Sequence, residues 1–254
     1  MIAIQSAHTF GNNVRMVKLP LIFLDDQLYA GAIANFYWLT RAMEEGLERL
    51  KSDWKVERVR SLQLHVSPGY EKDLKQLYGK ESWLASAKAA RTPATEAYVK
   101  ELEEADATQI VAAAFILYGA LVIGGGRATQ AKVKKVFPAC DHLLFDVSGG
   151  SMLEVRTSFR ECFNNIGKEV SSEIFDELVR LAAYYMSMNN TVVISIRCTS
   201  VTALWRPAIC LAIAIASAAT YKSTSSDGRL LPACCVGAAT GTAVGFGMWR
   251  AKCL

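Results

Sequence analysis

Residues 110–126 read IVAAAFILYGALVIGGG, a nearly continuous apolar run that ends in three consecutive glycines. The run predicts a buried helix that begins near Asp106 and continues to Ile123. Three glycines inside a helix would cost about 1 kcal/mol each relative to alanine, so they need a reason. A plain helix end is one reason, because glycine commonly ends helices. The other is a ligand site, since a helix broken at glycine brings its backbone close to a flat ligand.

The rest of the chain also favours helices over strands. Thr92 followed by Pro93 is typical of an N-cap and a first helical residue. Apolar residues recur at steps of three and four between residues 30 and 51, which is typical of an amphipathic helix. Three further helices are expected over residues 127–137, 152–165 and 171–196. A Gly- and Asp-rich loop is expected at residues 141–150. We therefore expect an all-α, multi-helical bundle.

The composition excludes several classes of protein. The chain has 254 residues and a net charge of +4 from 28 basic and 24 acidic residues, a balance that argues against a nucleic-acid partner. Seven cysteines are spaced irregularly with no CxxC pair, so neither a zinc site nor a disulfide framework is predicted. Residues 1–15 lack the basic and apolar regions of a secretory signal. We expect reduced thiols in a chain that faces the cytosol.

The last quarter of the sequence differs from the rest. Residues 207–221 and 230–249 contain no charged side chain, and Arg229 and Arg250 bound the second segment. Twenty uncharged residues are enough to span a bilayer core. We expect residues 1–200 to form the helical domain and residues 201–254 to form an apolar tail that anchors it in a membrane, as one span or a short hairpin. Buried helices of a soluble protein are the alternative, favoured by the many glycines and alanines of the second segment.

Familiar catalytic motifs are missing. The three histidines form no pair at metal-binding spacing, and no GxSxG, P-loop or dinucleotide fingerprint occurs in a strand-turn-helix context. A single histidine opposite a helix broken at glycines is, however, an arrangement that can bind haem through an axial ligand to the iron.

Several stretches resemble the haem oxygenase family, in the same order along the chain. The family's first long helix is similar to NFYWLTRAMEEGLERLK (35–51), and its middle helices to YEKDLKQLYGKESW (70–83) and TPATEAYVKELEEAD (92–106). Its distal helix is similar to residues 110–126, and its closing helix to EIFDELVRLAAYYMSMNN (173–190). The resemblance covers about residues 7–196 and implies haem sandwiched between a proximal helix and a distal helix kinked at glycines.

The resemblance also implies roles for individual residues. His8, followed by Thr9, matches the histidine that ligates the haem iron, and Gly124 with Gly125 matches the flexible glycine pair of the distal helix. Tyr118 and Leu121 would line the haem, and Arg160 is the candidate partner of a haem propionate, because arginine suits carboxylates.

Three positions depart from the family pattern. Leu121 stands where family members have an aspartate that holds waters for proton delivery, Leu117 stands at an arginine position, and Thr40 lies near a tyrosine position. In addition, Ala120 replaces a glycine that approaches the haem. Apolar side chains cannot hold waters, so the resemblance leaves catalytic competence as the open question.

The resulting hypothesis is a haem oxygenase that cleaves haem, its substrate and cofactor, to biliverdin, CO and Fe²⁺ with O₂. Electrons would come from a separate NADPH-dependent reductase or ferredoxin, for which Lys132, Lys134 and Lys135 offer a docking face if they are more than solvated surface. The alternatives are a membrane-attached haem carrier or sensor without turnover, and a helical scaffold that binds no haem. By resemblance to membrane-bound relatives, we expect the chain to be attached to the endoplasmic reticulum membrane, with the mitochondrial outer membrane as the second choice.

Overall fold

The computed structural model describes residues 2–124, 126–147 and 151–199. All regular elements in these ranges are helical, which confirms the all-α prediction. The elements are α1 (Ile2–Ile22), α2 (Asp26–Arg49), α3 (Trp54–Arg60), α4 (Ser67–Tyr78), α5 (Trp83–Ala89), α6 (Pro93–Glu104), α7 (Ala107–Val122), α8 (Gly126–Val136), the 3₁₀ turn η1 (Leu143–Phe145), α9 (Met152–Glu169) and α10 (Ser172–Ser195). Residues 201–254, including the expected tail, lie outside the described residues.

Most helices begin at side chains that satisfy the free backbone N–H groups of a first turn. The Thr92 hydroxyl accepts from the backbone N–H of Thr95 at the start of α6, as the Thr-Pro pair predicts. At α7, Asp106 and Gln109 form a reciprocal capping box. The predicted helices are therefore present, with ends that differ from the expected ones by a few residues.

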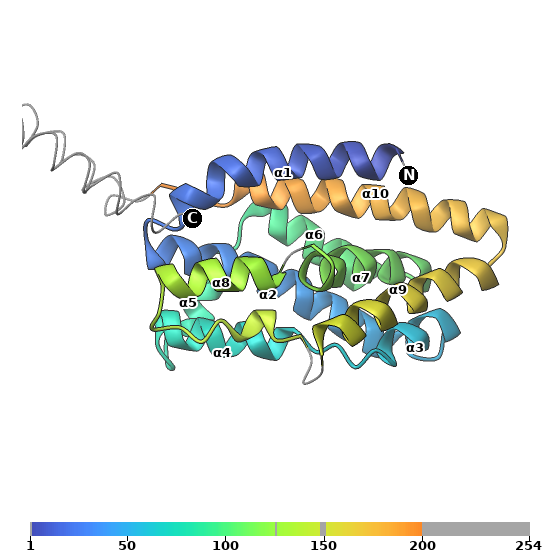
Figure 1. Ribbon diagram of the computed structural model, residues 1–254, viewed down its shortest axis with the longest axis horizontal. Coiled ribbons are helices and arrows are strands. Elements are labelled where there is room, and N and C mark those ends of the chain that lie inside the picture. Colours follow the sequence, from blue (N-terminus) through green and yellow to red (C-terminus); the bar gives the residue numbers. More distant parts are fainter. Residues whose placement is uncertain (1, 125, 148–150, 200–254) are drawn as a thin grey trace, which may run out of the picture.

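Two central helices carry most of the core. Helix α2 packs against α4, α6 and α7, and α7 in turn packs against α3, α9 and α10. Their facing sides are made of buried apolar residues, among them Leu39 and Met43 of α2 and Ile110 and Val111 of α7. Helices α1 and α10 run side by side along one edge of this core (Figure 1).

The sequence patterns did not predict α1. The backbone of Gly11 passes so close to α10 that a Cβ added there would lie 2.1 Å from Oδ1 of Asn190. The Asn190 side chain is anchored there, because its Nδ2 donates to the Ala7 carbonyl at 2.7 Å. Nearer its C-terminal end, α1 is attached by Lys18, whose ammonium group donates to the carbonyls of Val193 at 3.0 Å and Ile196 at 2.5 Å. Helix α1 is thus held mainly by α10.

This close contact can be tested with a pair of glycine substitutions. We expect Gly11→Ala to lower the free energy of unfolding by about 1–3 kcal/mol, because the added methyl group must displace the anchored Asn190 side chain. The matched control is Gly31→Ala in α2, where the nearest atom to an added Cβ is the Tyr78 hydroxyl at 3.8 Å. That substitution should stabilise the helix by up to about 1 kcal/mol. Urea unfolding of both variants measures the difference, and equal stabilities would contradict the contact.

Candidate functional site

The structure separates the three histidines. His142 is fully buried, with Nδ1 3.0 Å from the Tyr29 hydroxyl and Nε2 2.9 Å from the Phe137 carbonyl. Both its ring nitrogens are engaged, so it is not free to bind a ligand. His8 on α1 and His65 in the connection before α4 are both exposed. Only these two can offer an imidazole to a ligand.

The His8 ring has one engaged nitrogen and one free one. Its Nδ1 lies 3.3 Å from Nδ2 of Asn12, one helical turn further along α1. The Asn12 amide is itself oriented by Arg15, whose Nη1 donates to Oδ1 at 3.3 Å. No hydrogen bond joins Nε2 of His8 to any described residue. Because Oδ1 of Asn12 accepts from Arg15, its Nδ2 donates to Nδ1 of His8, which places the proton of a neutral His8 ring on Nε2. A histidine that binds a metal through Nε2 instead donates its Nδ1–H to an acceptor, so metal binding by His8 would require the Asn12 amide to turn over.

Arg15 is a residue that sequence reasoning missed. It lies seven positions after His8 and therefore on the same face of α1. It is half-buried, burial lowers the pKa of its guanidinium below the ordinary value, and it forms no ion pair with any described carboxylate. A partly desolvated guanidinium without a counter-ion is suited to an anionic group of a ligand.

The end of α7 presents small residues to the surface. Ala120 and Gly124, four positions apart and hence on one face, are both exposed. The backbone N–H groups of Ile123 and Gly124 both donate to the Gly119 carbonyl at 2.9 Å. The Ala120 carbonyl therefore loses the donor that a regular helix would supply. Gly125, the second residue of the expected glycine pair, lies outside the described residues.

Arg156 of α9 binds the end of α7, at the junction between α7 and α8. Nε of Arg156 donates to the Val122 carbonyl, the last carbonyl of α7, at 2.8 Å. Arg160, the arginine predicted from the sequence, lies one turn further along α9 and is exposed. Arg156 is the second residue that sequence reasoning missed, because no local pattern indicates a contact with a backbone carbonyl of another helix.

The residues at the distal positions are apolar or already paired. Leu117 is buried and Leu121 half-buried. Thr40 is buried, and its side chain hydrogen-bonds Tyr70. The Tyr118 ring is buried in α7, and its hydroxyl donates to the Leu64 carbonyl at 2.6 Å and to Oε1 of Glu44 at 3.2 Å. None of these side chains leaves a free polar atom beside the glycine junction.

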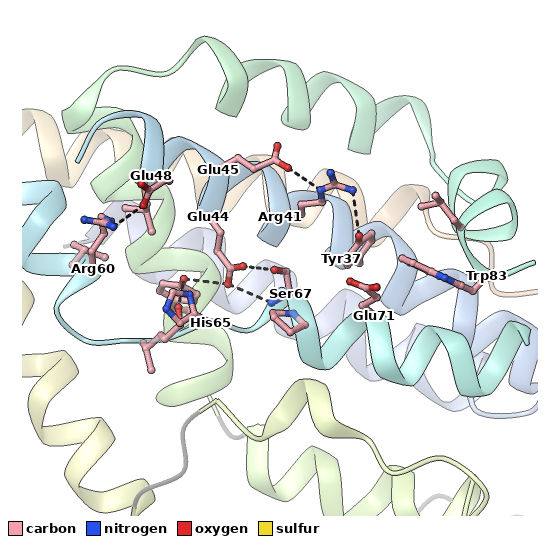
Figure 2. Close-up of a pocket in the computed structure, with 16 residues that line it drawn as sticks. Tyr37, Arg41, Glu44, Glu45, Glu48, Arg60, His65, Ser67, Glu71 and Trp83 are labelled. Carbon is pink, nitrogen blue, oxygen red and sulfur yellow. Dashed lines mark hydrogen bonds and ion pairs between the residues drawn. The ribbon is translucent and has the colours of Figure 1, made fainter. Parts of the chain in front are cut away.

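A cavity of about 520 Å³ lies between α2, α4 and the connection before α4 (Figure 2). Its lining includes His65, Tyr118 and Trp83, together with four glutamates at positions 44, 45, 48 and 71. Neither His8 nor Gly124 is among its lining residues. Arg41 and Arg60 also line the cavity, so its wall carries an excess of two carboxylates, which disfavours a ligand with carboxylates of its own because like charges repel.

The carboxylates of this cavity already have partners inside the protein. Figure 2 shows Glu45 paired with Arg41 at 2.8 Å and Glu48 paired with Arg60 at 2.6 Å. Glu44 accepts from the backbone N–H groups of Val66 at 2.7 Å and Ser67 at 3.3 Å, in addition to Tyr118. These bonds join α2 to the start of α4 and to α7, so the cavity wall has a structural role.

The exposed residues that the sequence singled out lie on two surfaces. One is the His8 face of α1 and the other is the exposed end of α7 with its junction to α8. Helix α10 packs against both α1 and α7, which places the two parts on a common support (Figure 1). Among the described residues, no group of three or more His, Cys, Asp or Glu side chains is arranged to hold a metal ion.

Comparison with known proteins identifies relatives of one kind. The family model described as "Heme oxygenase" matches residues 3–193. Heme oxygenase 1 of Nostoc sp. is 34% identical over 106 residues, which are 41% of this chain and 43% of that protein. Heme oxygenase of Rhodella violacea is 32% identical over 99 residues, 39% of this chain and 41% of that protein. Each match thus spans less than half of the relative's length.

Solved structures share the fold at lower sequence identity. Heme oxygenase 2 from Chlamydomonas reinhardtii, crystallised without heme, superposes with a TM-score of 0.71 at 23% identity, over 77% of this chain and 94% of the other. Heme oxygenase-1 from Synechocystis sp. PCC 6803, crystallised in complex with heme, gives a TM-score of 0.69 at 18% identity, over 84% and 96% of the two chains. These likenesses extend the agreement in helix arrangement to nearly the whole of each solved chain.

The role of Arg156 can be tested without any ligand. Arg156→Ala removes a charged hydrogen bond worth about 1.5–3 kcal/mol, so we expect amide hydrogen exchange at the junction of α7 and α8 to accelerate about ten- to a hundredfold. Arg160→Ala is the matched control on the same helix and should leave that exchange unchanged. Hydrogen-exchange mass spectrometry on peptides that cover residues 117–130 gives the answer. Unchanged exchange in Arg156→Ala would show that the junction is held by other contacts.

Proposed function

Because the chain belongs to the haem oxygenase family, we propose that it binds haem between the His8 face of α1 and the end of α7, and cleaves it with O₂ to biliverdin, CO and Fe²⁺. The observation that carries this proposal is the state of the three histidines. His142 has both ring nitrogens engaged, and His65 lines a cavity surrounded by carboxylates. His8 is left as the exposed imidazole with a free Nε2.

His8 would bind the iron through Nε2 as a neutral imidazole. A ligating imidazole needs a partner that fixes its ring orientation through the other nitrogen. Asn12 stands next to Nδ1, and Arg15 orients the Asn12 amide. Ligation through Nε2 leaves the proton on Nδ1, so the Asn12 amide would turn over on binding and accept from Nδ1–H through Oδ1, which gives up the present bond from Arg15.

The end of α7 would cover the opposite side of the ring. Exposed Ala120 and Gly124, together with Gly125, leave room for a flat ligand to approach the backbone. Leu121 would add an apolar contact to the ring. The Tyr118 ring is buried and would act only through its neighbours. Crowding by this backbone would direct oxygen to one edge of the macrocycle.

Proton delivery would rely on water held by the backbone. The Ala120 carbonyl lacks its helical donor, and a carbonyl with a free lone pair can anchor an ordered water. The Val122 carbonyl is already occupied by Arg156. A water on Ala120 would thus replace the water network that a carboxylate at position 121 would hold.

Two guanidinium groups are candidate partners of the haem propionates. Arg160 is exposed on α9, as the resemblance predicted, and Arg15 is half-buried without a counter-ion near His8. Charge-assisted hydrogen bonds from arginine to carboxylates are among the strongest polar contacts in proteins. We assign Arg160 to one propionate, and Arg15 to the other if the ring is oriented toward α1.

Haem supplies the redox chemistry of the reaction when it is bound, and the protein supplies ligation, orientation and access for water. Electrons would come from a separate reductase or ferredoxin. Lys132, Lys134 and Lys135 are all exposed on α8, and none of them is ion-paired within the described part of the chain. This basic face would complement an acidic electron donor.

Membrane attachment is part of the proposal. No helix among the described residues has the length and hydropathy needed to cross a bilayer. The uncharged segments 207–221 and 230–249 lie outside them, and their composition supports attachment of a cytosol-facing domain to a membrane. The endoplasmic reticulum is the first membrane to examine and the mitochondrial outer membrane the second.

A haem carrier or sensor without turnover is the second candidate. It is favoured by the apolar side chains at positions 117 and 121 and by the engaged hydroxyl of Thr40, which leave no titratable side chain at the distal positions. Such a protein would keep His8 and haem binding but would not release bilin.

The first test separates the two exposed histidines. We expect His8→Ala to abolish bilin formation and to change the Soret spectrum, because the axial ligand is lost. The matched control His65→Ala should retain both signals. The measurement is a turnover assay with haem-loaded protein, a reductase, NADPH and O₂, followed by bilin absorbance. Loss in His65→Ala with retention in His8→Ala would instead move the haem to the 520 Å³ cavity. Stable haem binding without bilin in the unmodified chain would favour the carrier or sensor.

The second test concerns proton delivery at position 121. Leu121→Asp places a carboxylate at a half-buried site beside the junction, where it can hold water, and we expect bilin formation to accelerate about tenfold. Leu121→Asn, which also holds water but is not a proton acceptor near neutral pH, should give a smaller gain. An unchanged rate in both variants would mean that proton delivery does not limit turnover.

A further inference from the structure

Three polar side chains form a continuous row along one side of α1. His8, Asn12 and Arg15 are separated by four and three residues, so they lie on one face of the helix. Nδ2 of Asn12 lies 3.3 Å from Nδ1 of His8, and Nη1 of Arg15 donates to Oδ1 of Asn12 at 3.3 Å. The Asn12 amide thus faces the imidazole with its nitrogen and the guanidinium with its oxygen.

The two neighbours of Asn12 determine which way its amide points. A guanidinium can only donate, so the amide atom beside Arg15 is the oxygen. The amide nitrogen is then the atom beside His8, and it donates to a ring nitrogen that carries no proton. The present orientation of Asn12 is therefore compatible with His8 only while Nδ1 is unprotonated.

The bond to Asn12 occupies the guanidinium of Arg15. Helix α1 contains no Asp or Glu, and within the described part of the chain the Arg15 side chain donates to no acceptor other than Oδ1 of Asn12. Burial lowers the pKa of the guanidinium, because it removes part of the water around the charge. A partly desolvated cation gains more from an anionic partner than from a neutral amide. Arg15 is thus engaged with a partner that a carboxylate can replace.

Ligation of iron through Nε2 changes this row. The proton of the His8 ring then lies on Nδ1, where it faces the amide nitrogen of Asn12, so two donors meet. Turning the amide over satisfies Nδ1–H, but it also places the amide nitrogen beside Arg15. The guanidinium then loses its acceptor and is released.

We propose that Asn12 couples iron ligation at His8 to the capture of a carboxylate by Arg15, so that this face of α1 binds a porphyrin that carries iron more tightly than one without iron. The inference rests on the haem site proposed above. His8 recognises the metal, Arg15 recognises a propionate, and Asn12 is the positioning residue that makes the second contact depend on the first.

The same coupling favours release of the product. A coupling between two contacts is reciprocal, because both depend on one amide. Once iron has left, His8 again carries its proton on Nε2, Asn12 returns to its present orientation, and Arg15 is withdrawn from the propionate. A bilin without iron is then held less tightly than haem, although it retains the carboxylates.

The test compares haem with iron-free protoporphyrin IX on the full chain, with affinities measured by quenching of tryptophan fluorescence. Asn12→Ala leaves Arg15 free before any ligand binds, so we expect the affinity for iron-free porphyrin to rise about three- to tenfold. The affinity for haem should change less, so the preference for haem falls. The matched control is Asn13→Ala, which removes an exposed asparagine whose side chain hydrogen-bonds no described residue, and both affinities should stay unchanged.

A double variant shows whether Arg15 is responsible. Adding Arg15→Gln to Asn12→Ala should remove the gain for iron-free porphyrin, because the released cation is gone. Unchanged porphyrin affinity in Asn12→Ala, or a gain that persists in the double variant, would overturn the coupling. The proposed haem site fails separately, namely if His8→Ala leaves the Soret spectrum of the haem-loaded protein unchanged. Circular dichroism of all variants checks that helix content is retained.

Discussion

One carboxylate joins helix α7 to two other elements of the core. Glu44 of α2 accepts hydrogen bonds from the start of α4 and from the Tyr118 hydroxyl of α7, so one side chain joins three elements. Buried donors that lose such an acceptor keep their full desolvation cost, which makes this contact hard to replace. Tyr118 lies six residues before Gly124, less than two turns of α7. Glu44, the Leu64 carbonyl and Arg156 therefore together hold the last two turns of α7, from which its small residues reach the surface.

The two walls of the proposed site differ in how they are held. Helix α7 contacts six other helices and is capped at its end by Arg156, whereas α1 is attached chiefly to α10. The α1 attachments are local: Gly11 against Asn190, and Lys18 on the last carbonyls of α10. A helix that packs chiefly against one neighbour can separate at a lower cost than one enclosed by six. Ligand entry should therefore involve movement of α1 rather than of α7.

The sequence predicted best where the signal was local. The Thr92-Pro93 cap and the apolar run that starts after Asp106 are short-range features, and the helices appeared there. Helix α1 was missed because Gly11 and Pro20 lower its propensity, and its apolar residues lie on more than one side; contact with α10 stabilises it instead. Arg156 was missed for a similar reason, since its partner is a carbonyl made available only by the ending of another helix. The resemblance to a family supplied His8 and the glycines, which no periodicity could single out.

At the proposed haem site, the apolar side chains at positions 117 and 121 would change what proton transfer requires. A carboxylate is useful in an enclosed pocket because it keeps water in a place that bulk solvent cannot reach. Here Ala120 and Gly124 are exposed in the protein without ligand, so water reaches the end of α7 directly. A backbone carbonyl does not titrate, but it can hold a water that exchanges its proton with solvent. Exposure and the Ala120 carbonyl, which has lost its regular helical donor, would together take over the function of an enclosed carboxylate. The rate would then depend on how far the bound ring shields that end of the helix.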